Sequence, residues 1–187
     1  MTAVASPRRT EIVDAAYQYV LEHGLAGASL RPVAEAVGSS TGVLRFLFGS
    51  KAGLVKAVLE RARHDELAML AAVRDEGAAD LAVIVARLWS WLSSPDHRPL
   101  LVLWVESYAA SLLDTDGPWA TFARGTVEDW LGLLGQAQSA RVRNTLAGRA
   151  ERTALLALLR GALLDLLATG DRKRTTAAVM GHLDRWR

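Results

Sequence analysis

The 187-residue sequence predicts an all-α protein, and three observations lead to this expectation. Apolar residues recur at helical spacing in one segment after another. No segment shows the alternation of apolar and polar residues that is typical of a half-buried strand. Breaks that contain Gly, Pro, Asp or Ser separate the segments. We expect about nine helices, divided between an N-terminal three-helix domain over residues 1–50 and a C-terminal helical bundle over residues 51–187.

Residues 29–54 predict two short helices joined by a tight turn and followed by a third helix. Ser29 suits the N-cap of the first helix, Pro32 suits its first turn, and Gly38 suits its end. Ser40 suits the N-cap of the second helix, and apolar residues follow it at helical spacing. Two helices separated by a short glycine-containing turn are typical of a helix-turn-helix, whose second helix enters the major groove of DNA.

The run Val37–Lys51, followed by Leu54, resembles the DNA-binding domain of the TetR (tetracycline-repressor-like) family of transcriptional regulators. The glycines, the capping serine, the apolar positions and the closing phenylalanine and lysine of this run have the spacing of the family pattern. The segment Arg9–Gly24 is similar to the first helix of the family. The likeness therefore covers roughly residues 9–60.

The helix-turn-helix and the resemblance together predict which residues contact DNA. Arg45 stands where the family usually has a tyrosine that touches the DNA backbone, and an arginine there can contact a phosphate or read a guanine. The residues expected to face base edges or the adjoining backbone are Arg31, Thr41, Gly42, Val43, Arg45 and Phe46. The residues expected to contact phosphates are Thr10, Ser29, Ser40 and Lys51. Arg8 and Arg9, placed before the first helix, are expected to reach the minor groove as a short arm.

The charge distribution agrees with a nucleic-acid partner. Residues 1–63 hold eight Lys or Arg against five Asp or Glu, whereas the net charge of the whole chain is only +2. This local surplus favours contact with phosphates and predicts an affinity that falls as the salt concentration rises. An ordinary scatter of charge over a solvated surface is the alternative that composition leaves open.

The rest of the sequence predicts further helices. A long amphipathic helix over residues 51–74 follows the helix-turn-helix directly. Pro118 suits the first turn of a later helix, and Gly170 suits the C-cap of the penultimate one. A polar segment over residues 135–144 is expected to separate these two helices. The helices after residue 74 are expected at residues 81–92, 100–113, 119–134, 151–169 and 172–186.

The penultimate helix has apolar residues on more than one face, which exceeds what burial against its own chain requires. The resemblance implies that the last two helices pair with their mates across a twofold axis in a homodimer. Such a homodimer matches a palindromic DNA operator with half-sites ~34 to 36 Å apart or a multiple of that distance. A core helix within a monomer is the alternative. The residues assigned to the dimer interface are Leu155, Leu158, Leu159, Ala162, Leu166, Val179, Leu183 and Trp186.

Five of the six tryptophans fall between residues 89 and 130, where helical spacing places several aromatic side chains on shared helix faces. Converging aromatics can wall an apolar pocket that also holds a few polar groups, and the resemblance implies an effector cavity in the C-terminal helices. A plain aromatic core is the alternative, and for Glu106 the alternative is a carboxylate bonded to a neighbouring helix. The expected ligand contacts are Trp89, Trp104, Glu106, Tyr108, Ser111, Trp119, Phe122, Thr126 and Trp130.

The sequence carries no catalytic or metal-binding motif, so we expect no enzymatic activity, no cofactor and no metal. The absence of cysteine excludes disulfides, thiolate catalysis and cysteine-type zinc sites. The four histidines lack the spacing of metal ligands, and no phosphate-binding glycine loop, nucleophile elbow or HExxH motif occurs. The N-terminus has no apolar h-region and no apolar run is long enough to span a membrane, which predicts a cytoplasmic protein without membrane contact.

Together these patterns predict a ligand-responsive, sequence-specific DNA-binding transcriptional regulator. The interpretation most consistent with the resemblance is a homodimeric repressor that a small apolar or aromatic effector releases from a palindromic operator. Activation instead of repression stays open at this point. A protein of a different class, a helical ligand-binding protein that has lost specific DNA binding, is the alternative, with Arg45 as the sign of that loss.

Overall fold

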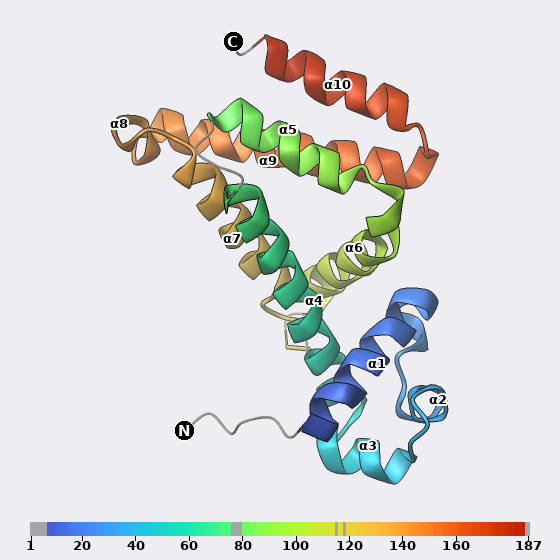
Figure 1. Cartoon of the computed structure of the whole chain (residues 1–187). Coiled ribbons are helices and arrows are strands. Elements are labelled where there is room, and N and C mark those ends of the chain that lie inside the picture. Colours follow the sequence, from blue (N-terminus) through green and yellow to red (C-terminus); the bar gives the residue numbers. More distant parts are fainter. Residues whose placement is uncertain (1–6, 76–79, 115, 118, 186–187) are drawn as a thin grey trace. The chain divides into compact units, whose positions relative to one another are not determined.

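The computed structural model describes residues 7–75, 80–114, 116–117 and 119–185. These residues form ten α-helices and two 3-10 helices and contain no strand, which confirms the all-α prediction and adds one helix to the expected number. In chain order the elements are α1 (Pro7–His23), η1 (Leu25–Gly27), α2 (Leu30–Ala36), α3 (Thr41–Phe48), α4 (Lys51–Asp75), α5 (Leu81–Leu92), η2 (Pro95–His97), α6 (Arg98–Leu113), α7 (Phe122–Gln136), α8 (Ala140–Arg143), α9 (Leu146–Thr169) and α10 (Arg172–Asp184) (Figure 1).

Side-chain caps explain where five of these helices begin. In each of them the N-cap side-chain oxygen accepts a hydrogen bond from the backbone N–H three residues later, which satisfies one of the free donors of the first turn. The capping pairs are Ser40 with Val43 (3.2 Å), Ser50 with Gly53 (3.2 Å), Asp80 with Val83 (2.9 Å), Thr145 with Gly148 (3.0 Å) and Asp171 with Arg174 (3.0 Å).

Two predicted boundaries need correction. The helix expected from Trp119 begins at Phe122, because the backbone N–H of Phe122 bonds the carbonyl of Trp119 in a turn before the helix. Pro118, expected in the first turn of that helix, lies outside the described residues. The polar segment expected over residues 135–144 contains the short helix α8, and α9 begins at Leu146 and not at residue 151, because Thr145 caps it.

The described residues group into two compact units. The first comprises those of Met1–Glu66 and Pro99–Arg124, and the second comprises those of Leu67–Arg98 and Gly125–Arg187. The first unit thus extends beyond the predicted domain over residues 1–50, because α6 packs in the same core as α1 to α4. The functional division between DNA binding and ligand binding stays a prediction. Within the described part of the chain no helix is long and apolar enough to cross a membrane.

The core of the first unit joins the N-terminal helices to α4 and α6. Ile12 of α1, Leu44 of α3 and Leu54 and Val58 of α4 are at most 2% exposed and belong to one apolar cluster. Leu103 of α6 lies in the same cluster. Since these side chains alternate with exposed ones at helical spacing, each helix buries one stripe and leaves the opposite face to solvent.

The core of the second unit forms where α5, α9 and α10 lie side by side (Figure 1). Leu88, Leu155, Leu159 and Val179 are fully buried there, and Trp89 is 1% exposed. The indole N–H of Trp89 donates to the hydroxyl of Thr176 at 3.0 Å, so that this large side chain is buried with its polar atom satisfied. The guanidinium of Arg174 donates twice to the Asp165 carboxylate at 2.7 Å and ties α10 to α9.

Candidate nucleic-acid interface

The turn between α2 and α3 has the geometry that a helix-turn-helix requires. Gly38 adopts a left-handed backbone conformation with φ of +62°, which glycine tolerates without strain. The N–H of Ser39 donates to the carbonyl of Ala34 at 2.9 Å, and the N–H of Gly38 donates to the carbonyl of Glu35. These two bonds form a Schellman motif, which ends α2 and redirects the chain within a few residues. Ser40 then caps α3 as predicted.

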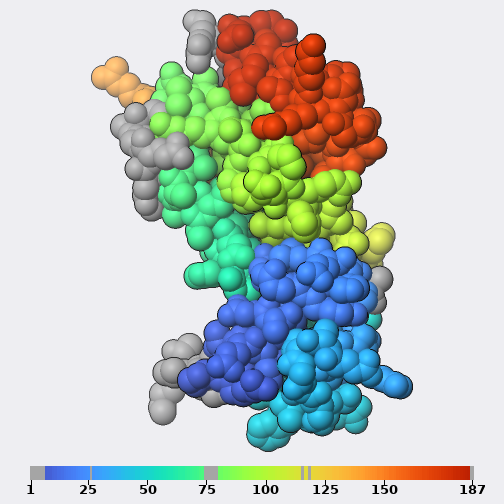
Figure 2. Space-filling view, turned by 45° about the vertical axis from the view of Figure 1, so that its right-hand side comes forward, coloured from blue at the N-terminus to red at the C-terminus, as the bar shows by residue number. Residues whose placement is uncertain are grey.

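Helix α3 buries one face and exposes the other. Leu44 is fully buried and Phe48 is 9% exposed, and both pack in the core of the first unit. The opposite face is open to solvent and carries five of the residues predicted to meet DNA: Thr41, Gly42, Val43, Arg45 and Phe46. Figure 2 shows the light-blue and cyan atoms of α2 and α3 at the surface of the first unit. The structure therefore presents these residues together on one accessible surface.

The basic residues predicted to contact DNA near α3 differ in position and in interaction partners. Arg31 is exposed and pairs with Glu35 one turn further along α2, at 3.1 Å. Arg8 and Arg9 lie in the first turn of α1 and not in an arm before it, because α1 already begins at Pro7. Proline is favoured at the first position of a helix, where its missing N–H has no acceptor to lose.

The side chains of these two arginines also interact with other residues of the first unit. Arg8 pairs with Glu11 at 3.2 Å, and the guanidinium of Arg9 lies 5.5 Å from the ring centre of Phe48. Arg8 is exposed, whereas Arg9 is half-buried and adjoins the end of α3 through Phe48.

The remaining predicted phosphate contacts lie at helix starts. Ser29 is the N-cap of α2 by position, although its side chain makes no capping hydrogen bond, and it is half-buried. Thr10 in α1 and Lys51 at the start of α4 are exposed. The hydroxyl of Ser40 caps α3, so its oxygen already accepts one hydrogen bond.

An ion-pair cluster that the sequence analysis did not single out connects α1 to α4. The guanidinium of Arg61 donates to Asp14 at 2.8 Å and to Asp65, and it lies 5.3 Å from the ring centre of Tyr17. The two carboxylates raise the pKa of Arg61, and burial raises the pKa of the Tyr17 phenol. Because Arg61 and Asp14 are 47 residues apart in sequence, no local pattern pointed to this link between α1 and α4.

Glu106 on α6 contacts the connection that follows α1. Its carboxylate accepts a hydrogen bond from the backbone N–H of Leu25 at 2.9 Å. A side chain at Gly24 would approach the same carboxylate to 3.2 Å, so the contact is close. This is the alternative that the sequence left open for Glu106, a carboxylate bonded to a neighbouring element. The same α6 carries Trp104 and Tyr108, whose ring centres lie 5.1 Å apart.

The nine predicted ligand contacts fall into both units. Ser111 is buried in the first unit, where its hydroxyl bonds the carbonyl of Tyr108 and the N–H of Ala123. Phe122, Thr126, Trp130 and Trp89 are at most 7% exposed. Those that keep partly exposed side chains are Trp104, Tyr108 and Trp119, together with the exposed Glu106.

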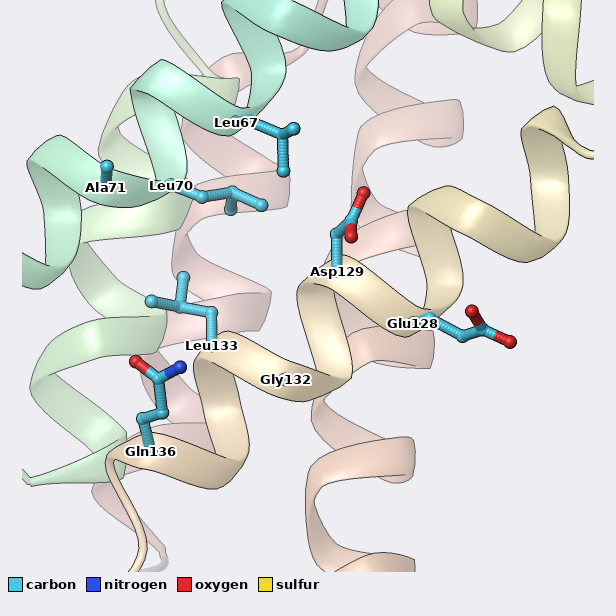
Figure 3. A pocket seen from close by; sticks show the side chains of 8 residues that line it. All are labelled: Leu67, Leu70, Ala71, Glu128, Asp129, Gly132, Leu133 and Gln136. Atoms are coloured by element: carbon cyan, nitrogen blue, oxygen red, sulfur yellow. The ribbon is translucent and has the colours of Figure 1, made fainter. Parts of the chain in front are cut away.

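A groove within the second unit lies between α4 and α7 (Figure 3). Its volume is about 290 Å³, close to the lower limit of ligand pockets of roughly 300 Å³. The lining combines apolar side chains with two carboxylates and comprises Leu67, Leu70, Ala71, Glu128, Asp129, Gly132, Leu133 and Gln136. None of the nine predicted ligand residues belongs to this lining.

The predicted dimer residues lie largely on the inner side of α9 and α10. Leu155, Leu159, Val179 and Leu183 are at most 3% exposed within the single chain, so they have no surface left for a partner. Leu158, Ala162 and Leu166 are half-buried, and Trp186 lies outside the described residues.

The exposed side of α9 carries a different apolar stripe. Its members follow one another at alternating intervals of four and three residues, the spacing of a helix-pairing seam. They are Ala150, Ala154, Ala157, Gly161, Leu164 and Ala168, all exposed in the single chain. Sequence reasoning missed this stripe because both sides of α9 are apolar. The signal that distinguishes them is size, since the larger side chains fill the core and the smaller ones lie outside.

A turn-linked helix pair with an exposed second helix defines the class of DNA-binding helix-turn-helix regulators. Residues 12–58, which contain this helix pair, match the sequence model of a protein family described as bacterial regulatory proteins, tetR family. A curated relative, the HTH-type transcriptional regulator BetI of Burkholderia thailandensis, is 32% identical over 106 residues, or 54% of each chain. The chain thus spans about half the length of the curated relatives that it matches.

Solved structures resemble the chain over nearly its whole length. The multidrug binding protein EbrR, complexed with proflavin, is 26% identical with a TM-score of 0.68, covering 94% of this chain and 99% of that one. A transcriptional regulator from Rhodococcus sp. Rha1 has a TM-score of 0.78 at 21% identity, covering 97% and 95%, and shows the shared fold. Residues 12–58 thus match the tetR family of bacterial regulatory proteins, and the solved structures share the fold of nearly the whole chain. This confirms the resemblance to the DNA-binding domain of the family that the sequence showed.

Proposed function

We propose that the chain acts in the cytoplasm as a ligand-responsive homodimeric repressor that binds a palindromic operator. The observation that carries the proposal is the outer face of α3, which is held by the Gly38 turn and the Ser40 cap and lies within the family match. A cationic residue, Arg45, is exposed on that helix, and Lys51 follows at the start of α4. Two such helices in successive major grooves meet two half-sites of one operator.

The proposed dimer uses the exposed stripe of α9 together with α10. Alanine and glycine side chains allow two helices to approach closely, and Leu164, 51% exposed, supplies the larger apolar contact. On α10, Ala177 and Ala178 are exposed and extend the small-residue surface. Pairing of α9 and α10 with their mates buries this surface in a four-helix arrangement.

The proposed effector is a small apolar or aromatic molecule that contacts α6. Trp104 and Tyr108 lie one turn apart there with partly exposed rings, and Glu106 between them holds the backbone of Leu25. A ligand that shifts α6 therefore changes the support of the connection between α1 and α2. That EbrR binds the aromatic molecule proflavin supports this class of effector.

Release from the operator follows from differential binding. An effector that prefers a conformation with a different separation of the two α3 helices draws the population away from the DNA-bound form. Linkage requires the operator to weaken effector binding by the same factor. Glu106→Ala is expected to reduce this coupling while DNA binding and effector binding each persist, because it removes the hydrogen bond to Leu25 without touching α3.

The test begins with a random pool of DNA duplexes from which the purified protein selects its targets. A discrete palindromic sequence is expected, and failure to retain any sequence contradicts the proposal and favours the ligand-binding protein without DNA binding. Tryptophan fluorescence is then followed during titration with proflavin in the absence of DNA.

Two variants locate the effector. Trp104→Ala is expected to weaken binding, whereas Gly132→Leu, which fills the α4–α7 groove, is expected to leave it unchanged. The added Cβ at Gly132 meets no atom within 4 Å, so this substitution fits the fold. Unchanged binding in Trp104→Ala together with weaker binding in Gly132→Leu would show that the effector binds in the α4–α7 groove and not at α6.

A further inference from the structure

We propose that Phe46, together with Val43, recognises thymine methyl groups in the major groove of the operator. The proposal rests on the proposed DNA-binding function and adds to it the base that the centre of α3 selects. It starts from an unusual feature of this helix, an aromatic side chain that is 89% exposed to solvent.

Position and burial place these two side chains on the DNA-facing side. Val43 is 40% exposed and precedes Phe46 by three residues, so the two share one face of the helix. Leu44 and Phe48 are buried on the opposite face, and they anchor α3 in the core of the first unit. The phenyl ring of Phe46 is therefore free of the core and projects from a firmly held helix.

Chemistry restricts what such a face can read. Helix α3 has the sequence TGVLRFLF and carries one charged residue, Arg45, and no acid. Val43 and Phe46 have no side-chain donor or acceptor, so they cannot hydrogen-bond a base edge. Among the groups that the four base pairs present in the major groove, only the C5 methyl of thymine is apolar. Contact with this methyl removes apolar surface of both partners from water, which is favourable.

Exposed cationic side chains around this face of α3 favour its contact with DNA. Arg45 and Lys51 are exposed on α3 and at the start of α4, and Arg8 is exposed in the first turn of α1. Contacts of these cations with the DNA position the helix, while the apolar pair adds a preference for thymine. Insertion of an apolar wedge between base steps occurs in the minor groove and does not require a methyl group, so it predicts a different response to base substitution.

The experiment replaces thymine by uracil, which pairs identically but lacks the methyl. The operator is selected from a random duplex pool with the wild-type protein, and duplexes are synthesised with deoxyuridine at each thymine in turn. At one or two positions of each half-site, wild-type affinity is expected to fall about three- to tenfold, the order expected for one buried methyl group. The other thymines are expected to tolerate the exchange.

Two variants assign the effect to the side chain. Phe46→Ala is expected to bind the thymine operator more weakly and to bind the thymine and uracil operators equally at the sensitive positions. Arg45→Ala is expected to bind more weakly overall and to keep the difference between thymine and uracil. Circular dichroism and light scattering verify that both variants keep the fold and the oligomeric state, which their exposed positions favour.

The outcomes separate the two proposals. Equal binding of every uracil operator by the wild-type protein overturns methyl recognition and leaves the DNA-binding function standing. A difference between thymine and uracil that survives in Phe46→Ala overturns the role of Phe46. If the protein selects no sequence from the pool, the DNA-binding function itself fails and methyl recognition fails with it.

Discussion

Arg45 is the only charged side chain of α3, and it is exposed beside the apolar pair formed by Val43 and Phe46. Its guanidinium suits either of two partners, a phosphate oxygen or the acceptor edge of a guanine. The two partners have different consequences for salt dependence and for sequence preference. A single substitution therefore distinguishes them.

Arg45→Ala is expected to lower operator affinity by roughly 5- to 150-fold, the order of one strong base or phosphate contact per protomer. Loss of a phosphate contact reduces the slope of log affinity against log salt by about 0.9 for each protomer, whereas loss of a guanine contact relaxes the preference at one position. A salt-controlled binding titration measures both effects. Arg141→Ala, which removes an exposed positive charge from α8, is the control. Unchanged operator affinity in Arg45→Ala would discard the role of this residue.

At the level of the helix, α3 is only eight residues long and depends on its cap and its buried anchors. Isolated helices of this length are unstable in water, so the hydrogen bond from Val43 to Ser40 and the burial of Leu44 hold the helix together. The same reasoning applies to α5, which Asp80 caps in the second unit.

Ser40→Ala is expected to lower the free energy of unfolding by about 1 kcal/mol and to weaken operator binding, because the first turn of α3 loses its acceptor. Asp80→Ala removes a cap of the same geometry from α5 and is expected to lower stability similarly without weakening operator binding. Urea unfolding and gel-shift titration provide the two readouts. Equal loss of DNA affinity in both variants would show that the effect comes from global stability and not from α3.

Helices α9 and α10 are joined by the bidentate pair of Arg174 and Asp165. The hydrogen bonds from Arg174 hold the pKa of Asp165 below its usual range. Because the folded-state pKa is the lower one, the pair contributes stability above the unfolded-state pKa of about 3.9 and loses it as the pH falls through the folded value. The contribution is modest, since both side chains are partly solvated.

Asp165→Asn is therefore expected to lower the melting temperature slightly at pH 7, and the difference from the wild-type protein should shrink as the pH falls below about 4. Thermal unfolding followed by circular dichroism over a pH series measures this difference. Lys173→Gln, an exposed position of α10, serves as the charge control and is expected to show no such convergence. A difference in melting temperature between Asp165→Asn and the wild-type protein that stays constant down to pH 2 would contradict the assigned role of the pair.

At the scale of the whole molecule, the exposed stripe of α9 is the proposed dimer interface. Six small or apolar side chains at pairing intervals leave a continuous apolar face on the single chain. A dimer through this face presents two copies of α3 and links DNA affinity to protein concentration.

Gly161→Arg is expected to yield a folded monomer with weaker operator binding, because an arginine in the middle of the stripe cannot be buried without a partner. An added Cβ at Gly161 meets no atom within 4 Å, so the fold of the single chain is expected to persist. Gly132→Arg on α7 has the same open surroundings and serves as the matched control that stays dimeric. Sedimentation measures both, and a dimer that survives Gly161→Arg would place the interface elsewhere.

Local patterns in the sequence determined the helices and the helix-turn-helix. Ser40, Gly38 and Gly170 ended or began helices where expected, because caps and left-handed turns depend on neighbours a few residues away. Helix α4 (Lys51–Asp75) and helix α5 (Leu81–Leu92) lie within one residue of their predicted bounds for the same reason, since amphipathic spacing is a local property.

Only the tertiary structure decided which apolar face meets which neighbour. The apolar pattern of the penultimate helix and the resemblance placed Leu155 and Leu159 at a partner surface. Packing against α5 and α10 instead buries them and leaves Ala157 and Gly161 outside. The tertiary structure likewise brings the Glu106 carboxylate to the backbone N–H of Leu25, 81 residues earlier in the chain, from which it accepts a hydrogen bond. Burial and long-range hydrogen bonds depend on partners distant in sequence, and spacing along one helix carries no information about those partners.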